Sequence, residues 1–426
     1  MFLIYSSLYT IAIIILFLPQ YFKRPKELRH KWLREKFGFL NSELRTLPAG
    51  RQALNSKLIW IHAVSVGEVN ASIQLIKKLK SRYPQLTIVL STITDTGQKV
   101  AMEKSPEGTY VVYLPFDMKF VLNRCFRRFK PKIFIVIETE IWPNIFRFMA
   151  DQEVPVITLN GRISEKSSKG YKKISFFMKK VLSYVKMFGM QSKADADRLR
   201  DIGADREKIA VLGNFKFDMD MPEKVPAWAA GIKGPVIVAG STHRGEEEII
   251  LSAYIENLNR FPELKLILAP RHPERFREVE DILKAKGIAY IKRSALGSQL
   301  PAPGVLRSGV ILLDSIGELS AVYGVADISI IGKSLTGFGG QNPLEPAYWG
   351  RPVLCGPHME NFPFIKDFYQ EGAAFEVDGI TLAKKIKEFL VEPEKAKAVG
   401  TKAKELYTKN SGAVDRAMEV IKEYIG

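Results

Sequence analysis

Two acidic residues in the first half of the chain each follow a short apolar run. Glu68 comes after the run 58–63, and Glu138 comes directly after the run 133–137. A carboxylate at the carboxyl end of a strand in an α/β cleft can act as a general base. The spacing of Ser65 and Glu68 also fits a capping box, in which Glu68 only stabilises the start of its helix. The local sequence leaves both interpretations of Glu68 open.

An acidic motif and a lysine add further candidates. Residues 138–144 read Glu-Thr-Glu-Ile-Trp-Pro-Asn. Two carboxylates beside an aromatic side chain and a proline are unusual in a solvated turn, so we expect them to have a raised pKa or to orient a cation. The alternative is a helix cap plus a surface charge. Lys216 lies just before a Pro-, Gly- and Ala-rich segment at 222–234. It can reach an anion there, or it can be a surface lysine with its charge in water.

The second half of the chain carries residues suited to a phosphate. Arg271 follows the apolar run 264–268 and can make a bidentate contact with a phosphate or a carboxylate. The segment 316–319, Ile-Gly-Glu-Leu, begins a helix whose free backbone N–H groups suit a phosphate or a base edge.

A glycine-rich segment, 332–345, follows another apolar run. Its glycines permit close approach of the backbone to a ligand. Asn342 and Glu345 are placed to hydrogen-bond a ribose, and Pro343 fixes the turn. The segment is neither a Walker loop nor a Gly-x-Gly-x-x-Gly fingerprint, and no HExxH motif or pair of CxxC motifs indicates a metal.

Strands that alternate with helices must position these residues. The expected strands of the first half are 58–63, 87–91, 110–114, 133–137 and 154–159, and those of the second half are 236–239, 264–268, 310–313, 328–331 and 352–354. Short apolar strands alternating with helices predict an α/β fold with parallel sheets covered on both faces.

The length of 426 residues indicates two sizeable domains. We expect a membrane anchor at 1–22, a first domain at 23–221 and a second domain at 222–426. Two such domains in tandem predict a cleft that faces the carboxyl ends of both sheets.

The amino terminus predicts a membrane anchor. Residues 1–22 contain no charge, and seven basic residues follow at 23–36. About 20 apolar residues are enough to cross a bilayer, and basic flanking residues stay on the cytoplasmic side. We interpret the segment as one uncleaved anchor, with an apolar helix that lies in the membrane interface or in the fold as the alternative. A basic stretch with interleaved apolar residues at 162–186 predicts a further helix suited to a membrane surface.

Composition narrows the class of protein. The net charge of +17 indicates an anionic partner, and much of it lies next to the apolar amino terminus, which favours anionic lipid headgroups over nucleic acid. Two cysteines exclude a disulfide framework or a Cys-rich metal site.

Taken together, the motifs resemble those of bacterial Kdo (3-deoxy-D-manno-octulosonic acid) transferases specific for lipid A. The resemblance covers nearly the whole chain. It rests on the amino-terminal anchor and on the segments 32–39, 62–68, 138–144, 214–218, 241–243, 271–275, 317–319 and 339–346. An insertion at 41–57 departs from the usual short connection. The resemblance implies a GT-B fold of two Rossmann-like domains that face a cleft.

The resemblance also implies roles for individual residues. It makes Glu68 the proton acceptor, and Glu138 and Lys216 the residues that stabilise the transition state. The residues that it implies for CMP binding are Pro270, Arg271, Ile316, Gly317, Glu318, Asn342, Pro343, Leu344 and Glu345. It implies no cofactor and no metal.

The activity implied is inverting transfer of Kdo from CMP-Kdo to the tetraacylated, bisphosphorylated lipid A precursor, lipid IVA, in lipopolysaccharide core biosynthesis. The implied partners are CMP-Kdo, the lipid A precursor and a membrane with anionic lipids, without nucleic acid. The implied location is the inner membrane, with both domains on the cytoplasmic face. Two alternatives stay open: another membrane-associated GT-B glycosyltransferase that uses a UDP-sugar, and a non-catalytic adaptor that binds anionic lipid.

Overall fold

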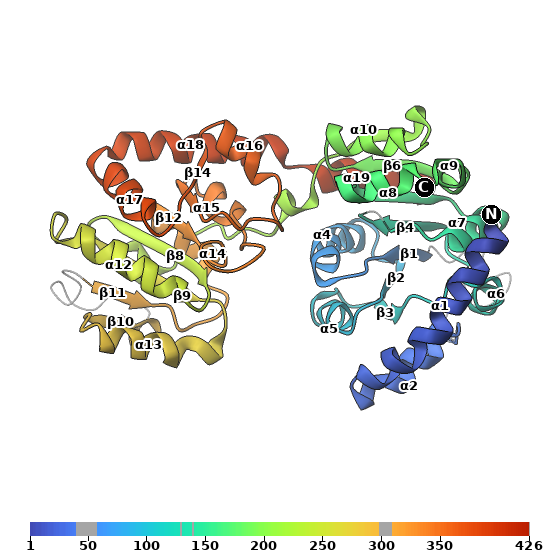
Figure 1. The fold of residues 1–426 in the computed structure, drawn as a ribbon, viewed down its shortest axis with the longest axis horizontal. Coiled ribbons are helices and arrows are strands. Elements are labelled where there is room, and N and C mark those ends of the chain that lie inside the picture. Colours follow the sequence, from blue (N-terminus) through green and yellow to red (C-terminus); the bar gives the residue numbers. More distant parts are fainter. Residues whose placement is uncertain (40–57, 128–129, 139, 298–308, 426) are drawn as a thin grey trace. The chain divides into compact units, whose positions relative to one another are not determined.

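The computed structural model forms two units, shown in Figure 1. Unit 1 comprises Met1–Met219 and Ser411–Gly426, and unit 2 comprises Asp220–Asn410. The residues that the structure describes are 1–39, 58–127, 130–138, 140–297 and 309–425. The insertion expected at 41–57 and Thr139 of the acidic motif lie outside them.

Unit 1 is built on a parallel sheet of seven strands in the order β3-β2-β1-β4-β5-β6-β7. The strands are β1 (Leu58–His62), β2 (Thr87–Thr92), β3 (Thr109–Tyr113), β4 (Ile133–Ile137), β5 (Val156–Gly161), β6 (Val185–Met190) and β7 (Ile209–Val211). Every residue of β1 and β4 is buried. These two strands read as continuous apolar runs because both faces of a parallel sheet are covered by helices.

Helices cover both faces of this sheet (Figure 1). One buried apolar cluster joins the sheet to α4 and α19, and a second joins the opposite face to α7 and α9. The helices of unit 1 are α1 (Phe2–Lys23), α2 (Lys26–Lys36), α4 (Val66–Arg82), α5 (Asp95–Lys104), α6 (Lys119–Phe126), α7 (Pro143–Asp151), α8 (Glu165–Lys172), α9 (Ser175–Leu182), α10 (Lys193–Asp201) and α19 (Ala413–Ile425), with short 3-10 turns η2 (Arg206–Lys208) and η3 (Phe215–Asp218).

Unit 2 has its own parallel sheet of seven strands, in the order β10-β11-β9-β8-β12-β13-β14. The strands are β8 (Val236–Thr242), β9 (Lys265–Pro270), β10 (Tyr290–Lys292), β11 (Gly309–Leu312), β12 (Ile328–Ile331), β13 (Val353–Cys355) and β14 (Ala374–Glu376). The helices are α11 (Ala227–Ala230), α12 (Glu246–Leu258), α13 (Phe276–Ala285), α14 (Leu319–Val322), α15 (Leu344–Tyr348), α16 (Ile365–Gln370), α17 (Thr381–Val391) and α18 (Pro393–Asn410), with turns η4 (Pro273–Arg275), η5 (Arg293–Ala295) and η6 (Tyr323–Val325). The expected doubly wound α/β fold is thus present in both halves.

The end of the chain differs from the division expected from sequence. That division placed all of 222–426 in the second domain, whereas α19 belongs to unit 1. Its apolar stripe, which includes Ala417 and Ile421, is buried in the core cluster that holds α4. The carboxylate of Asp218 accepts hydrogen bonds from the N–H groups of Gly412 and Val414 at 2.5 and 2.6 Å, which fixes the start of α19.

The single helix expected at 162–186 is also wrong. The chain forms α8 and α9 as two short helices, and β6 begins at Val185. The periodicity of Phe177, Val181 and Val185 continues across the end of α9, because a buried strand also presents valine to the core.

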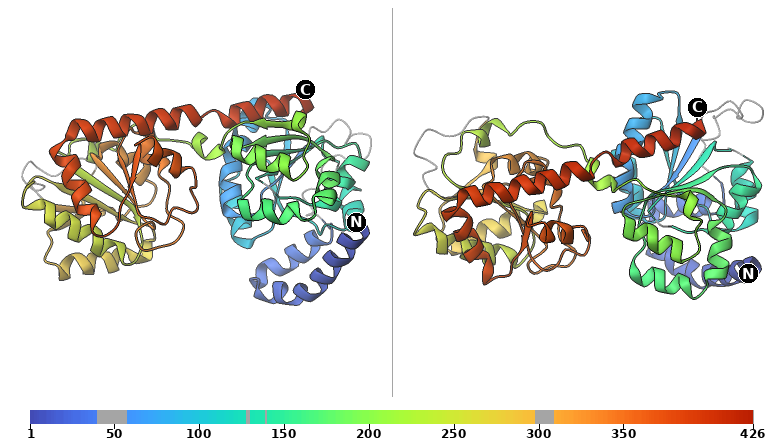
Figure 2. Two further views of the ribbon diagram at one scale, coloured as in Figure 1. Left: turned by 45° about the horizontal axis from the view of Figure 1, so that its top comes forward. Right: turned by 90° about the horizontal axis from the view of Figure 1, so that it is seen from above.

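The amino-terminal helix α1 packs on unit 1 together with α2, and Figure 2 shows the two as neighbouring dark-blue helices. Trp32 of α2 is buried in a small apolar cluster with Phe116 of unit 1, and Phe17 of α1 packs against that cluster. α1 is also the one helix within the described residues that is long and apolar enough to cross a membrane.

Candidate active site

The carboxyl ends of β1 and β4 bring two of the sequence candidates to one edge of the sheet. The strands are neighbours in register, with His62 opposite Val136. Glu138 follows β4 directly, and Glu68 lies in the first turn of α4, which begins shortly after β1. Residues from the two chain segments therefore meet at the sheet edge where α/β proteins bind ligands.

The Glu68 carboxylate caps the start of its own helix. Its Oε2 accepts a hydrogen bond from the Val64 N–H at 2.7 Å, and its Oε1 accepts one from the Ser65 hydroxyl at 3.1 Å. The side chain of Ser65, the N-cap residue, makes no cap hydrogen bond to the helix backbone. Neither hydrogen bond of a capping box is present: Glu68 reaches one residue beyond the N-cap to Val64, and the Ser65 hydroxyl is turned to Glu68.

Three carboxylates lie close enough to affect one another. The pKa of Glu68 is raised to about 7, mainly by burial and also by the negative charges of Glu138 and Glu140, while the hydrogen bond from Val64 opposes the shift. Burial and the charge of Glu138 likewise raise the pKa of Glu140 to about 7. A carboxylate with a pKa near neutrality is suited to accepting and releasing a proton at physiological pH.

Glu138 combines an unusual backbone with a positive environment. Its φ of +60° lies in the left-handed region, which is uncommon for residues other than glycine and often marks functional sites. Burial raises the pKa of Glu138, while the charges of Lys216 and Arg162 lower it. Burial lowers the pKa of Lys216, and the carboxylate of Glu138 opposes that change. The structure therefore places the predicted residues Glu138 and Lys216 together.

The turn that carries Lys216 is held by two asparagines. The Asn214 side chain accepts a hydrogen bond from the Lys216 N–H at 3.0 Å. The Asn160 Oδ1 atom accepts one from the Phe215 N–H, also at 3.0 Å, across the sheet edge from β5. Asn160 is fully buried with φ +56°, and its Nδ2 atom has no hydrogen-bond partner within the described part of the chain.

Sequence reasoning missed Arg162 and Asn160 as site residues. Both belong to the Asn-Gly-Arg segment that ends the strand expected at 154–159. Their position at the carboxyl end of a strand was the available signal. Within the described residues, no group of three or more His, Cys, Asp or Glu side chains is arranged to hold a metal ion.

In unit 2, the predicted residues Arg271 and Glu345 lie near each other. Arg271 follows Pro270 at the end of β9, its N–H donates to the Thr242 carbonyl at 3.1 Å, and its side chain is exposed. Burial raises the pKa of Glu345 to about 7, and the charge of Arg271 opposes this shift. An exposed guanidinium at the end of a central strand is available to an anionic ligand.

The predicted residues 342–345 form a turn and the start of α15. The Asn342 Oδ1 atom accepts a hydrogen bond from the Leu344 N–H at 3.0 Å, with Pro343 between them. The Asn342 Nδ2 atom lies 3.5 Å from Glu345 Oε1, a long hydrogen bond. The side chains of Pro343 and Leu344 are buried, so they shape the turn and leave polar contacts to Asn342 and Glu345.

The segment 316–318 follows β11 and divides into an exposed part and an anchored part. Ile316 is 68% exposed, and Gly317 has φ +91° with open space where a Cβ would stand. The Glu318 carboxylate is already bound within unit 2. It accepts hydrogen bonds from the Arg293 guanidinium, the Trp228 Nε1 and the Ser315 hydroxyl. Glu318 therefore fixes the loop, and the open positions beside it are Ile316 and Gly317.

A buried glutamate that sequence reasoning did not select organises the glycine-rich loop. Glu246 is fully buried in the first turn of α12. Its carboxylate accepts backbone hydrogen bonds from Lys333, Ser334 and Leu335 at 2.6 to 2.9 Å, and one from His243 at 2.8 Å. Four charge-assisted bonds hold the end of β12 in place beside the end of β8.

Sheet order explains why the predicted segments of unit 2 share one edge. Strands β11, β9, β8 and β12 are consecutive neighbours in a parallel sheet, and the predicted segments follow β9, β11 and β12. The predicted catalytic residues belong to unit 1, and the predicted CMP-binding residues belong to unit 2.

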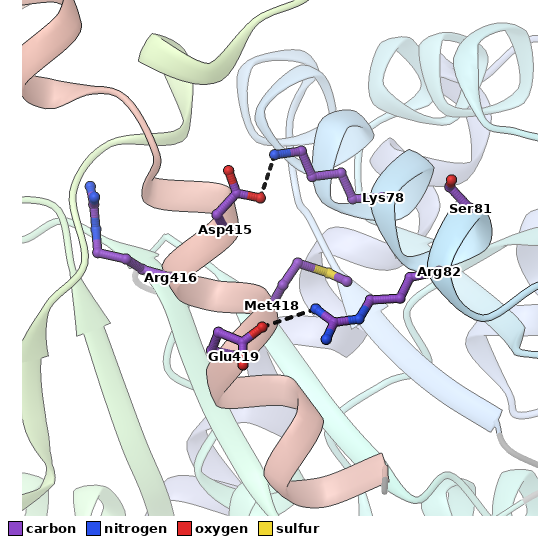
Figure 3. Close-up of a pocket in the computed structure, with 7 residues that line it drawn as sticks. All are labelled: Lys78, Ser81, Arg82, Asp415, Arg416, Met418 and Glu419. Carbon is purple, nitrogen blue, oxygen red and sulfur yellow. Dashed lines mark hydrogen bonds and ion pairs between the residues drawn. The ribbon is translucent and has the colours of Figure 1, made fainter.

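One pocket of unit 1 lies away from these residues. It is lined by Lys78, Ser81, Arg82, Asp415, Arg416, Met418 and Glu419 (Figure 3). Lys78 pairs with Asp415 at 2.5 Å and Arg82 pairs with Glu419 at 2.9 Å, so the cations of α4 face the carboxylates of α19. These exposed pairs join two helices, and none of the predicted site residues lines the pocket.

Comparison with known proteins gives a consistent match. A family described as "3-Deoxy-D-manno-octulosonic-acid transferase (kdotransferase)" matches residues 31–219. The 3-deoxy-D-manno-octulosonic acid transferase of Haemophilus influenzae is 34% identical over 402 residues, which cover 92% of this chain and 91% of that protein. The enzyme of the same name from Aquifex aeolicus is 34% identical, over 78% of this chain and 86% of that protein.

Solved structures give the same fold. A glycosyltransferase from Rickettsia africae aligns with a TM-score of 0.53 and 15% identity, over 87% of this chain and 99% of that one. At this identity the likeness shows the GT-B fold alone. It agrees with the two parallel sheets and their helices.

Proposed function

The chain belongs to the 3-deoxy-D-manno-octulosonic acid (Kdo) transferase family, and on that premise we propose that it moves Kdo from CMP-Kdo to the tetraacylated, bisphosphorylated lipid A precursor. Membership makes it a glycosyltransferase of lipopolysaccharide biosynthesis. Our proposal adds the donor, the acceptor and an inverting single displacement.

The observation that carries the proposal is the group of charges at the ends of β1 and β4. Glu68, Glu138 and Glu140 interact electrostatically there, and Lys216 and Arg162 lie beside Glu138. A sugar hydroxyl that attacks the donor must lose a proton, and Glu68 is the base in our proposal because burial and its acidic neighbours raise its proton affinity.

The remaining charges suit the other requirements of the transfer. The leaving group is CMP, a phosphate monoester, which needs no proton from a general acid. Lys216, held against Glu138, stabilises negative charge as it develops. A retaining hydrolase needs a second carboxylate as nucleophile, whereas a direct displacement with inversion does not. Glu138 is therefore not needed as a nucleophile in this scheme, and its role is to orient Lys216.

Donor binding falls to unit 2 in our proposal. Arg271 contacts the CMP phosphate, the backbone at Ile316 and Gly317 approaches the nucleotide, and Asn342 and Glu345 bind the ribose. Glu318 contributes by fixing its loop through Arg293. We propose that the reaction needs no metal, since guanidinium, ammonium and backbone N–H groups meet the phosphate charge.

The experiment is a transfer reaction with defined substrates. The purified chain is incubated in detergent with CMP-Kdo and the tetraacylated lipid A precursor, and the lipid is analysed by mass spectrometry. We expect the mass of one or more Kdo residues to be added, with CMP released in equal number and with no loss of activity in EDTA. Parallel reactions with UDP-sugars are the control. Transfer from a UDP-sugar, or none from CMP-Kdo, contradicts the proposal.

A further inference from the structure

The helix expected to anchor the chain touches unit 1 along its whole length. Its partly buried residues recur every three or four positions and form one stripe: Phe2, Tyr5, Ser6, Tyr9, Thr10, Ile13, Phe17 and Tyr21. Phe2 packs on Phe177 of α9 with ring centroids 5.2 Å apart, and Phe17 packs on Trp32 of α2 at 5.7 Å. This spacing is that of one face of an α-helix.

Polar groups fasten the amino end of α1. The Tyr5 hydroxyl donates a hydrogen bond to the Asp117 carboxylate at 2.8 Å, and the Asp117 N–H donates to the Tyr9 hydroxyl at 3.2 Å. The Ser6 hydroxyl lies within hydrogen-bond distance of the Asn144 side chain, at 3.0 Å from its Nδ2 atom. Tyr5, Ser6 and Tyr9, which would be costly in the hydrocarbon of a bilayer, thus have partners on unit 1.

The carboxyl end of α1 is fastened to the same unit. Arg24, the residue after the helix, donates from Nε to the Asp95 carboxylate at 2.6 Å. Its guanidinium also lies over the ring of Trp32 at 4.4 Å. Both ends of α1 are therefore tied to one folded unit.

These contacts conflict with a spanning helix. A helix of 22 residues is about 33 Å long, close to the roughly 30 Å of a bilayer core. A spanning helix would carry its amino end to the far side of the membrane, where unit 1 cannot reach it. The contacts of Phe2, Tyr5 and Arg24 are possible together only if both ends stay on one side.

The face of α1 that points away from the rest of unit 1 is mostly apolar. The exposed large apolar side chains of this helix are Leu3, Ile4, Leu8, Ile11, Ile14, Ile15, Leu16, Leu18 and Phe22. Its exposed uncharged polar side chains are Ser7 and Gln20. Beside the amino end, α9 adds Phe176, which is 81% exposed, with the exposed Lys173 and Lys179 in and next to that helix. Exposed Lys23 and Lys26 flank the other end. An apolar face bordered by cations matches one leaflet with anionic headgroups.

We propose that α1 lies in the plane of one membrane leaflet as a docked part of unit 1, and that its apolar face together with α9 is the surface that contacts anionic phospholipid. Three of the basic residues that follow α1 have other contacts and are not counted as part of this lipid-binding surface. Arg24 is paired with Asp95, Lys36 is buried, and Lys31 donates to the Val111 carbonyl at 3.1 Å.

The docked helix also reaches the candidate site. The Asp117 carboxylate that binds Tyr5 accepts hydrogen bonds from the N–H groups of Asn144 and Ile145 at 3.1 and 2.6 Å. Both residues lie in the first turn of α7, and Asn144 is the last residue of the acidic motif 138–144. Membrane contact and the segment that carries Glu138 are thus joined through one buried carboxylate.

Topology of the amino terminus tests the proposal directly. One variant has a cysteine inserted after Met1. A second variant carries Ile380→Cys, an exposed position in unit 2 that reports on which side of the membrane the folded units lie. The native Cys125 and Cys355 are buried, so we expect them not to react with the reagent. Sealed membrane vesicles of each orientation are treated with a maleimide that cannot cross the bilayer. We expect both cysteines to react in the same vesicles. Reaction of the inserted cysteine from the opposite side, or only after detergent, overturns the proposal.

Vesicle binding tests the lipid-facing surface. Ile15→Glu places a charge on the outward face, and Ile380→Glu is the matched change on unit 2. With vesicles of phosphatidylglycerol and phosphatidylethanolamine, we expect Ile15→Glu to lower the bound fraction at least several-fold and Ile380→Glu to leave it unchanged. Equal binding of both variants contradicts the assignment of this face.

Discussion

At the residue scale, the Glu68 carboxylate has two roles that use the same oxygens. It caps α4 through Val64 and Ser65, and its acidic neighbours raise its proton affinity. The two roles are compatible, because a carboxylate has about four lone-pair sites and only two are used here. The hydrogen bonds hold the base in place, which limits the reorganisation needed during proton transfer.

The raised pKa of Glu68 gives the activity a defined pH dependence. The carboxyl group accepts a proton only when ionised, and burial raises its pKa from 4.5 to about 7. Activity is therefore expected to fall as the pH drops below about 7, by about tenfold for each further pH unit, whereas a base with an ordinary glutamate pKa would keep the activity constant down to about pH 4.5. The measurement is kcat/KM for Kdo transfer against pH, and a flat profile between pH 5 and 8 would rule out this titration.

Arg271 is expected to contribute to donor affinity. Arg271→Ala removes a charge-assisted contact with the CMP phosphate, which costs about 1.5–3 kcal/mol, or about ten- to a hundredfold in affinity. Calorimetric titration with CMP measures it. Arg277→Ala, an exposed change of the same charge on α13, is the control. Equal CMP affinity of the two variants would place the phosphate elsewhere.

Asn160 is expected to act as a positioning residue for Lys216. Asn160→Ala removes the acceptor for the Phe215 N–H and lets the η3 turn shift, so kcat falls by up to about a hundredfold while CMP affinity is unchanged. Asn160→Asp keeps the acceptor and is expected to recover part of kcat. An alanine variant with normal kcat, or an aspartate variant no better than alanine, would speak against this role.

The individual site residues were predictable to different degrees. Glu68, Glu138, Arg271 and Glu345 follow apolar strands, and that position is readable from sequence. The hydrogen bonds between Glu318 and Arg293 were not predictable, because the two residues lie 25 positions apart in the sequence and meet only in the folded unit. The proximity of Lys216 to Glu138 depends in the same way on the return of the chain after β7.

At the scale of elements, strands that read as apolar runs were predictable, and these include the edge strand β3, which matches the strand expected at 110–114. The short edge strands were not predictable. Expected strands at 133–137 and 328–331 match β4 and β12, because parallel strands covered on both faces read as unbroken apolar runs. The edge strands β7, β10 and β14 have three residues each, too few for a periodic signal. At 162–186 the sequence predicts one helix where the structure has two helices and the start of β6, because the apolar spacing continues beyond the end of α9.

Removal of α1 is expected to weaken unit 1. A protein lacking residues 1–20 loses the hydrogen bond from Tyr5 to Asp117 and the packing of Phe17 on Trp32. Two or three such contacts correspond to a melting temperature lower by about 5–10 °C. Differential scanning calorimetry in detergent measures the change. The double change Tyr5→Phe with Tyr9→Phe is expected to give a smaller decrease. An unchanged melting temperature of the truncated protein would mean that α1 is not docked.

At the scale of the whole molecule, two doubly wound units were expected from length and strand spacing. The placement of α19 in unit 1 was not, because it depends on contacts with residues far away in the sequence: the Asp218 carboxylate at Gly412 and Val414, and the pairs of Lys78 with Asp415 and Arg82 with Glu419. The net charge of +17 indicates an anionic partner. In the structure, some of the basic residues pair with acidic residues of the same unit, as Arg24 does with Asp95.

In the proposed reaction, unit 1 supplies the base, and this base is Glu68. The most direct measurement is the single-turnover rate of Kdo transfer by Glu68→Gln, with saturating CMP-Kdo and acceptor. The glutamine side chain can still accept the hydrogen bond from the Val64 N–H, so melting temperature and CMP affinity should be nearly unchanged, while it cannot take the proton. We predict a rate about 10²–10⁴-fold lower, with Glu103→Gln, an exposed change on α5, at the wild-type rate. A Glu68→Gln protein that transfers Kdo at close to the normal rate would show that Glu68 only caps its helix.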